Sequence, residues 1–266
     1  MIPRIIHYCW FGNNPKPPIA QKCYKSWRKY CPEYKIIEWN EDNFDLSTAP
    51  LYVQQAYIAK KWAFVTDYIR LKVVYDNGGI YLDTDVELVR SLDDLLGYRA
   101  FFGFEGKQYI NTGLGFGAVQ NTPILKELMK DYEDNPFSMG DGTFDLTPCP
   151  ARNTEVFMRF GLVCDGSKQM LEQRILILPE EYLCPIDNAT RVLRKTRNTI
   201  SIHHFDASWQ NPEEKKSHDN LARKRRARNR KDKILYFPRR ALRKVLGNKL
   251  YDVIKNTLKI RKRAEG

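Results

Sequence analysis

Residues 62–85 constrain the fold of this chain more than any other segment. Apolar side chains recur at helical spacing over residues 62–75, which predicts a helix with a broad buried face. Asn77, Gly78 and Gly79 follow as a C-terminal cap. The apolar residues 80–82 then predict a short buried strand. A helix that leads directly into a buried strand is the repeating unit of an α/β sheet.

Strand and helix patterns alternate through the first half of the chain. This order predicts an α/β fold with a mostly parallel central sheet and helices on both of its faces. We expect strands at residues 4–10, 34–39, 80–82, 86–89, 100–104, 113–119, 174–178 and 200–205, and helices at 19–30, from 52, at 62–75 and at 124–132. Residues 1–210 would form one domain with this fold.

The remaining residues, 211–266, differ in charge from the rest. They hold 20 of the 44 Lys and Arg residues but only 6 of the 32 Asp and Glu residues, whereas residues 1–210 are near neutral. After Pro238, apolar residues keep helical spacing as far as Leu258, with Lys and Arg between them. We therefore expect a C-terminal extension, residues 211–266, with a basic amphipathic helix. Such a helix suits an anionic membrane surface; alternatively, it folds back onto the core.

Cysteine usage and apolar patterning indicate the compartment. The six cysteines form no CxxC pair, so we expect free thiols in a reducing compartment and no structural zinc site. The N-terminal residues lack the pattern of a signal peptide, and no apolar run is long enough to cross a bilayer. These features predict a cytoplasmic protein, held peripherally on the inner face of the cell membrane by its basic extension.

Two aspartates follow the strand expected at residues 80–82. Asp83 and Asp85 are separated by one residue, and residues i and i+2 of an extended chain point the same way. Both carboxylates would then face one site at the end of a parallel strand, where open α/β sheets bind ligands. A hard divalent cation takes such oxygens and completes its shell with substrate phosphates. The pair predicts a metal site; the alternative is a solvated turn with two surface aspartates.

The chain resembles glycosyltransferase family 32, the DXD-containing sugar transferases, which include many bacterial capsular and other polysaccharide transferases. The resemblance covers residues 2–210 and rests on four runs: 2–12 (IPRIIHYCWFG), 63–70 (AFVTDYIR), 75–85 (YDNGGIYLDTD) and 203–209 (HHFDASW). It implies a GT-A fold, a nucleotide-sugar donor, Mn²⁺ or Mg²⁺, and retention of the anomeric configuration. The chain departs from many relatives at residues 147–150 (TPCP), where those relatives carry a Gly-Pro turn.

The resemblance implies a catalytic group of four residues. Asp85 would bind the metal, and Asp83 would contact the ribose and sugar of the donor and reach the metal through water. Asp67 and Arg70 lie three residues apart, hence on one helix face, and would orient the donor sugar. A plain intrahelical ion pair is the alternative for these two.

Further residues complete the site that the resemblance implies. His203 or His204 would be a second protein ligand of the metal; adjacent strand residues face opposite sides, so at most one serves, and we favour His203. The glycine-rich run 111–117 (NTGLGFG) is not followed by GK[ST] and lies within a strand pattern, so it is not a phosphate-binding loop. The remaining assignments are Tyr8 and Trp10 at the nucleotide base, Asn111 at the donor or acceptor in the sugar pocket, and Ser208 and Trp209 at the diphosphate. Core packing is the alternative for Tyr8, Trp10 and Trp209.

Together with the metal site that the paired aspartates predict, the resemblance implies a retaining, metal-dependent glycosyltransferase in polysaccharide biosynthesis. It would move a hexose or N-acetylhexosamine from a nucleotide sugar, UDP-linked ahead of GDP-mannose, to a glycan or lipid-linked glycan acceptor. We expect same-face attack by the acceptor rather than a covalent intermediate. One alternative is a nucleic-acid-binding protein that uses the basic run 223–228, although residues 1–210 are near neutral and carry no nucleic-acid-binding motif. Another is a glycoside hydrolase with paired carboxylates.

Overall fold

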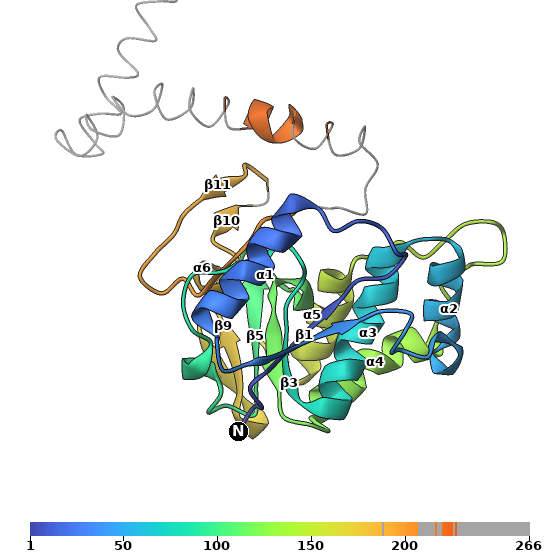
Figure 1. The fold of residues 1–266 in the computed structure, drawn as a ribbon, viewed down its shortest axis with the longest axis horizontal. Helices are drawn as coiled ribbons and strands as arrows, with labels where there is room; N and C mark the ends of the chain where they lie inside the picture. The colour runs from blue at the N-terminus through green and yellow to red at the C-terminus, as the bar shows by residue number, and fades with distance from the viewer. Residues whose placement is uncertain (188, 207–215, 217–219, 226, 228–266) are drawn as a thin grey trace, which may run out of the picture. The chain divides into compact units, whose positions relative to one another are not determined.

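The computed structural model describes residues 1–187, 189–206, 216, 220–225 and 227 (Figure 1). The chain divides into Met1–Asn211 and Pro212–Gly266, and the description below concerns the first unit. Most of the C-terminal extension lies outside the described residues, so its basic amphipathic helix and its boundary stay predictions.

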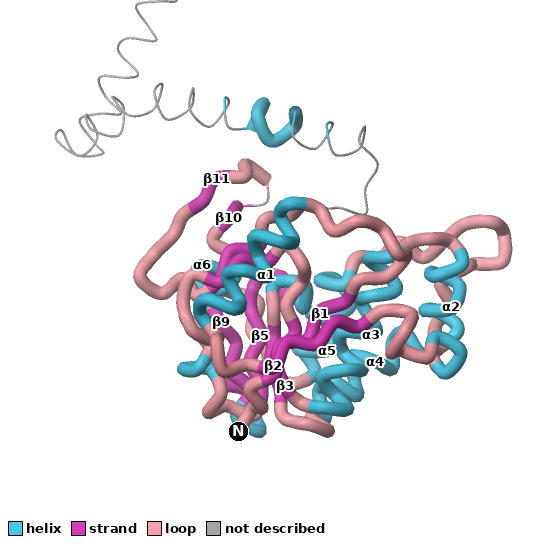
Figure 2. Tube along the Cα trace, viewed as in Figure 1, coloured by secondary structure: helices cyan, strands magenta, loops and turns pink. Residues whose placement is uncertain are grey.

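An eight-stranded sheet forms the centre of the first unit (Figures 1 and 2). Five of its strands, β1, β2, β3, β5 and β9, run in one direction, because β7 lies antiparallel between β3 and β5. The predicted α/β fold with a mostly parallel sheet is confirmed. The strand order is β2 (Lys35–Trp39), β1 (Ile5–Cys9), β3 (Gly79–Tyr81), β7 (Phe116–Ala118), β5 (Ala100–Glu105), β9 (Ile175–Leu178) and β8 (Gln169–Leu171), and β6 (Tyr109–Ile110) pairs with β5.

Helices cover both faces of this sheet (Figure 1). Side chains alternate along β3, so Ile80 joins the core under α1 while Tyr81 joins the core under α3, α4 and α5. Buried aromatic and aliphatic side chains of this size contribute about 1.5–3 kcal/mol each. The α-helices are α1 (Pro18–Tyr30), α2 (Leu51–Ile58), α3 (Trp62–Asn77), α4 (Pro123–Asp134), α5 (Cys149–Arg159) and α6 (Glu180–Leu183).

The junction between α3 and β3 depends on its two glycines. Gly78 ends the helix at φ 65°, and Gly79 follows at φ 111°, a conformation that L side chains rarely adopt. A Cβ on Gly79 would lie 2.8 Å from His7 Nε2. His7 Nε2 in turn donates to the Gly78 carbonyl at 2.8 Å. The cap expected from the sequence therefore also aligns β3 beside β1.

A two-stranded sheet extends from the end of β3. Strand β4 (Val86–Leu88) pairs antiparallel with β12 (Ser201–His203), and His203 stands opposite Val86. A second two-stranded sheet joins β10 (Ile186–Asp187) and β11 (Val192–Leu193). The pairing of β4 with β12 brings the end of the first unit next to Asp85.

Several observed helices and strands differ from those predicted from the sequence. The strand expected at 113–119 is confined to β7, because Asn111 caps a 3₁₀ turn, η3 (Thr112–Leu114), just before it. Helices α5 and α6 and strands β6, β8, β10 and β11 were not predicted. The other short 3₁₀ turns are η1 (Leu46–Thr48), η2 (Asp93–Leu95) and η4 (Glu172–Arg174).

Candidate functional site

Asp83 and Asp85 share a tight turn at the end of β3. Strand β3 ends at Tyr81, and the amide of Val86 donates to the Asp83 carbonyl at 3.0 Å, which closes the turn. The expectation that an extended backbone aims both carboxylates the same way is wrong. The turn nevertheless brings one carboxylate oxygen of Asp83 within 4.8 Å of one of Asp85.

His203 completes a cluster with these two aspartates. Its Nε2 lies 3.2 Å from Asp85 Oδ1, and one potential ligand atom from each of the three residues lies within 4.8 Å of the others. His204 faces the other way, with Nε2 2.8 Å from Glu87 Oε2. The structure thus brings His203, and not His204, to the carboxylates, as alternation along a strand requires.

The donor set of this cluster suits a divalent cation. Two carboxylates and one imidazole are oxygen and nitrogen ligands that Mn²⁺ accepts. The Nδ1 atom of His203 is buried and has no hydrogen-bond partner in the described part of the chain. Among the described residues, the ring is therefore held by Asp85 through Nε2 and by an edge contact with Phe205.

Asp85 and His203 shift each other's pKa in opposite directions. Burial raises the pKa of Asp85, but the charge of His203, its hydrogen bond and the amide of Asp206 outweigh burial and lower that pKa to about 2. The Asp206 amide donates to Asp85 Oδ2 at 2.8 Å. Burial also lowers the pKa of His203, but Asp85 outweighs it and raises that pKa. Asp85 is therefore an anion throughout the physiological range.

Arg70 connects helix α3 to the aspartate turn. Its Nη2 lies 3.0 Å from Asp67 Oδ1 and 3.5 Å from Asp83 Oδ1. The Asp67–Arg70 pair is consequently more than the intrahelical pair that was the alternative reading. The side chains of Arg70 and Asp67 are at least nine-tenths buried, whereas that of Asp83 is 25% exposed, so the network runs from the interior to the edge of the site.

Side chains around Arg70 hold its guanidinium in place. Arg70 Nε donates to the Thr66 carbonyl at 3.1 Å, and the guanidinium lies 5.2 Å from the centre of the Tyr81 ring. The Tyr81 hydroxyl donates to Asp83 Oδ1 at 2.9 Å. Burial raises the pKa of Asp67 and of Asp83, and Arg70 opposes that rise at both. The sequence-based prediction missed Tyr81, because its position in a buried strand is typical of core packing.

The turn η3 packs its backbone directly onto this network. Asn111 accepts from the Gly113 amide at 2.7 Å and donates through Nδ2 to Glu105 at 2.7 Å. A Cβ on Gly113 would lie 2.6 Å from Asp83 Oδ2 and 3.1 Å from Arg70 Nη1. Gly113, which the sequence-based prediction did not single out, therefore allows the approach of Asn111 to Asp83.

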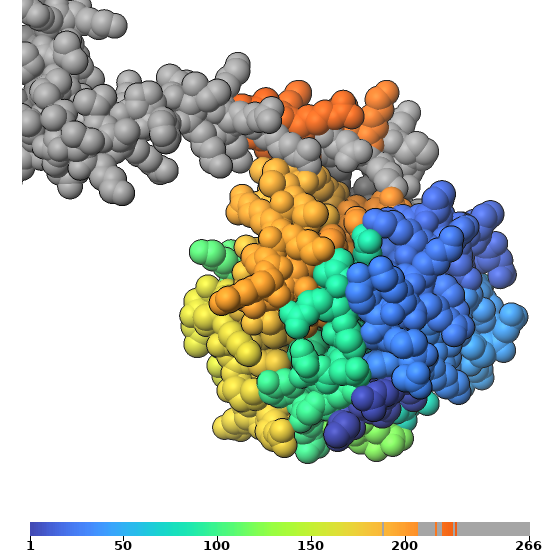
Figure 3. All heavy atoms as spheres, turned by 60° about the vertical axis from the view of Figure 1, so that its left-hand side comes forward, coloured from blue at the N-terminus to red at the C-terminus, as the bar shows by residue number. Residues whose placement is uncertain are grey.

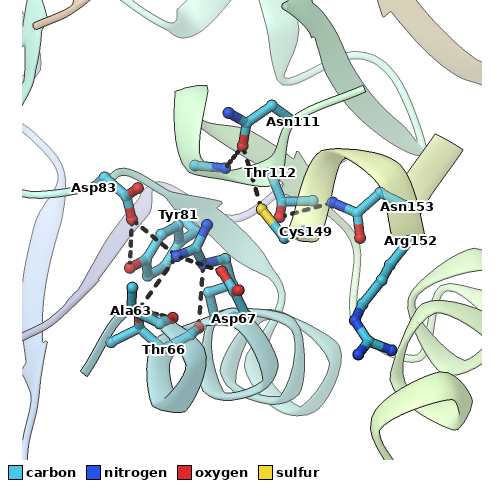
Figure 4. A network of polar contacts seen from close by, with 12 residues as sticks. Ala63, Thr66, Asp67, Tyr81, Asp83, Asn111, Thr112, Cys149, Arg152 and Asn153 are labelled. Carbon is cyan, nitrogen blue, oxygen red and sulfur yellow. Dashed lines mark hydrogen bonds and ion pairs between the residues drawn. The ribbon is translucent and has the colours of Figure 1, made fainter. Parts of the chain in front are cut away.

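Helix α5 begins against the same network. The thiol of Cys149 donates to Asn111 Oδ1 at 3.6 Å, and Asn153 Nδ2 donates to Thr112 Oγ1 at 3.1 Å (Figure 4). The TPCP run that departs from many relatives thus starts a helix that touches the site. Pro148 and Pro150 were the available signal, since proline is common at the start of a helix.

The other predicted donor-binding residues lie apart from these contacts. Tyr8 packs 5.4 Å from Trp27, measured between ring centres, and its hydroxyl donates to Glu38. Trp10 Nε1 donates to the Asn14 carbonyl at 2.7 Å. The predicted contact of Tyr8 and Trp10 with a nucleotide base stays a prediction. Ser208 and Trp209 lie outside the described residues.

The segment that contains Asp67, Arg70, Asp83 and Asp85 is similar to known proteins. Residues 17–102 match the glycosyltransferase sugar-binding region containing a DXD motif. This segment carries the DXD region of the sugar transferases. The resemblance noted from the sequence is confirmed, and Asp83-Thr84-Asp85 is its DXD motif. Asn111 and His203 fall beyond the matched segment, so the fold, and not the matched region, brings them to the motif.

Curated relatives cover the same part of the chain. Inositol phosphoceramide mannosyltransferase 3 of Schizosaccharomyces pombe is 29% identical over 134 residues, 49% of this chain and 37% of that protein. An uncharacterized glycosyltransferase of Acanthamoeba polyphaga mimivirus is 29% identical over 143 residues, 49% of this chain and 55% of that protein. The chain thus spans less than two thirds of the length of either relative.

Solved structures with a comparable arrangement are more distant. The PaToxG glycosyltransferase aligns with a TM-score of 0.47 and 16% identity over 59% of this chain and 69% of its own. A galactosyltransferase solved with donor and acceptor sugar analogs aligns with a TM-score of 0.42 and 13% identity, over 82% of this chain and 95% of its own.

Proposed function

We propose that this protein is a metal-dependent glycosyltransferase that moves a sugar from a nucleotide-sugar donor to a glycan acceptor. The observation that carries the proposal is the clustering of Asp83, Asp85 and His203 beside the buried Arg70 network. The match of residues 17–102 to a DXD-containing sugar-binding region supports it.

Asp85 and His203 would hold the cation, with Asp83 at its outer side. When bound, Mn²⁺ or Mg²⁺ would neutralise the charge that develops on the departing nucleoside diphosphate. Asp85 suits this role because its low pKa keeps it ionised without a metal. The Asp206 amide holds the second oxygen of Asp85, which fixes the direction of the carboxylate.

Asp67, Arg70 and Asp83 would orient the donor sugar. Carboxylates accept hydrogen bonds from sugar hydroxyls, and Arg70 opposes the rise in pKa that burial causes at both of them. Because these side chains already contact one another before the donor binds, ordering them on binding costs little free energy. Asn111, which contacts this network through Gly113, would line the same pocket.

We further propose retention of the anomeric configuration by same-face attack of the acceptor. Asp67 is at least nine-tenths buried and paired with Arg70, which disfavours its use as a free nucleophile beneath the sugar. The proposed donor is a UDP-hexose or UDP-N-acetylhexosamine, with Tyr8 and Trp10 at the base and Ser208 and Trp209 at the diphosphate. Isolation of a covalent glycosyl-enzyme would contradict same-face attack.

The proposed setting is polysaccharide biosynthesis, such as capsule assembly, on a lipid-linked acceptor in the cytoplasm. The basic extension, residues 211–266, would hold the enzyme to the inner face of the membrane. The described helices include none with the length and apolarity needed to cross a bilayer.

The decisive experiment measures release of nucleoside diphosphate from a panel of nucleotide sugars with Mn²⁺ present. We expect turnover with one donor and a loss of about a hundredfold or more in Asp85→Asn. The matched control is Glu87→Gln, two residues further on, whose carboxylate contacts Lys22 and His204. Full activity of Asp85→Asn would refute the proposal.

A further inference from the structure

An exposed hairpin on the first unit combines apolar and basic side chains. Val192 and Leu193 of β11 are 39% and 49% exposed, although they are aliphatic. Arg194, Lys195 and Arg197 follow them directly and are exposed as well. Isolated exposed aliphatics are ordinary on protein surfaces, but a pair flanked by this many cations is typical of a membrane-facing loop.

The charges of this hairpin are largely unbalanced. Arg194 has a distant partner, Asp187, at 3.9 Å. Lys195 and Arg197 form no salt bridge within the part of the chain that the structure describes. A cation without a nearby carboxylate keeps its attraction for external anions, so the hairpin presents a net positive field to solvent.

Helix α1 adds a second row of cations on the same face. Lys22, Lys25, Arg28 and Lys29 are all exposed and lie on the outer side of the helix. Figure 3 shows the hairpin in orange and the α1 segment in blue on one side of the molecule, with a strip of teal residues between them. We call this surface, Lys22, Lys25, Arg28, Lys29, Val192, Leu193, Arg194, Lys195 and Arg197, the basic rim.

Both halves of the basic rim have neighbours that contact the residues just after β12. On one side, the guanidinium of Arg191 lies 5.1 Å from the centre of the Phe205 ring, and Phe205 lies 4.3 Å from the His203 ring. On the other side, Lys22 bonds Glu87 at 2.7 Å, and Glu87 contacts His204. The basic rim thus neighbours the segment that follows His203.

We propose that the basic rim is a docking surface for an anionic lipid bilayer, with Val192 and Leu193 entering the headgroup region. Each Lys or Arg near an anionic surface adds to the attraction, and the apolar pair selects a bilayer over a purely charged polymer. The C-terminal extension, with its 20 Lys and Arg, follows in sequence from the same strand end. The proposal concerns location and does not rest on the sugar-transfer activity.

The test measures co-sedimentation of the full chain with vesicles of phosphatidylcholine alone and of phosphatidylcholine mixed with phosphatidylglycerol. We expect binding to the mixed vesicles, reduced about fivefold in Val192→Asp/Leu193→Asp and about tenfold in Arg194→Glu/Lys195→Glu. The matched controls are Met158→Asp/Val163→Asp, apolar residues elsewhere that are even more exposed, and Lys126→Glu, an exposed lysine of α4. These controls should bind like the wild type.

A second measurement separates the hairpin from the extension. In Leu193→Trp, brominated lipids should quench additional tryptophan fluorescence relative to the wild type, because residue 193 enters the bilayer. Unchanged binding of Val192→Asp/Leu193→Asp together with no added quenching would overturn the proposal. Loss of binding in the charge-reversal variant alone would overturn it as well, because it would identify a surface for anionic polymers.

Discussion

Arg70 lies 3.5 Å from Asp83 Oδ1 although the two residues come from a helix and from the turn after the next strand. The same guanidinium lies 3.0 Å from Asp67 on its own helix. One buried cation thus balances the buried carboxylate of Asp67 and the partly exposed carboxylate of Asp83. Such an arrangement is costly to disrupt, because removal of the cation leaves the buried Asp67 without compensation.

The first prediction concerns this balance. Arg70→Met should lower the free energy of unfolding by about 3–5 kcal/mol, because it leaves the buried Asp67 without its cation. Urea denaturation of the purified protein measures the change. Lys72→Met on the same helix is the control, since its exposed pair with Asp76 contributes about 0–1 kcal/mol. Equal effects of the two substitutions would contradict the buried network.

The second prediction concerns the backbone contact at Gly113. Gly113→Ala places a methyl group 2.6 Å from Asp83 Oδ2 and must displace either the carboxylate or η3. We expect a loss of about a hundredfold in kcat/KM, the size that small misplacements of catalytic groups produce. Gly97→Ala is the control, because a Cβ there meets nothing within 4 Å. Wild-type kinetics of Gly113→Ala would show that the contact is unimportant.

The third prediction distinguishes the two adjacent histidines. Mn²⁺ should raise the melting temperature of the wild type, because a ligand that binds only the folded state stabilises it by about 2.7 kcal/mol at a hundred times its Kd. His203→Gln should abolish this shift, whereas His204→Gln should keep it, since His204 faces Glu87. Differential scanning fluorimetry with and without Mn²⁺ checks both. Loss of the shift in His204→Gln alone would reverse the assignment.

The fourth prediction concerns pH and His7. His7 donates through Nε2 to the Gly78 carbonyl and accepts through Nδ1 from Trp39 at 3.0 Å, so the structure holds the neutral ring. Burial lowers its pKa from 6.5 to about 4. The unfolded chain binds the proton first, so this stability is complete above pH 6.5 and is lost as the pH falls towards 4, by about 3 kcal/mol in all.

Urea denaturation at several pH values checks the contribution of His7. The loss of stability between pH 6.5 and 4 should be smaller in His7→Gln than in the wild type, because that residue no longer titrates. Other groups titrate equally in both proteins, so the difference between the two curves isolates His7. Parallel curves would contradict the prediction.

Much of the fold was predictable because its local signals agree. The apolar rhythm of α3, the glycines at its end and the apolar β3 all favour the same unit, and β1, α1 and β2 follow equally plain patterns. Helix α5 and the strands of the small sheets were missed. They are short or interrupted, and contacts with the rest of the fold, rather than periodicity, decide them.

The sequence by itself determined the helix–strand unit before Asp83 and the residue types at the motif, because periodicity and turn chemistry are local properties. Only the tertiary structure decided which side chains meet there. The turn after β3 orients Asp83 and Asp85, the pairing of β4 with β12 selects His203, and the close approach of Gly113 brings Asn111 near Arg70. These contacts join residues far apart in the chain, and their geometry depends on packing that no single segment encodes.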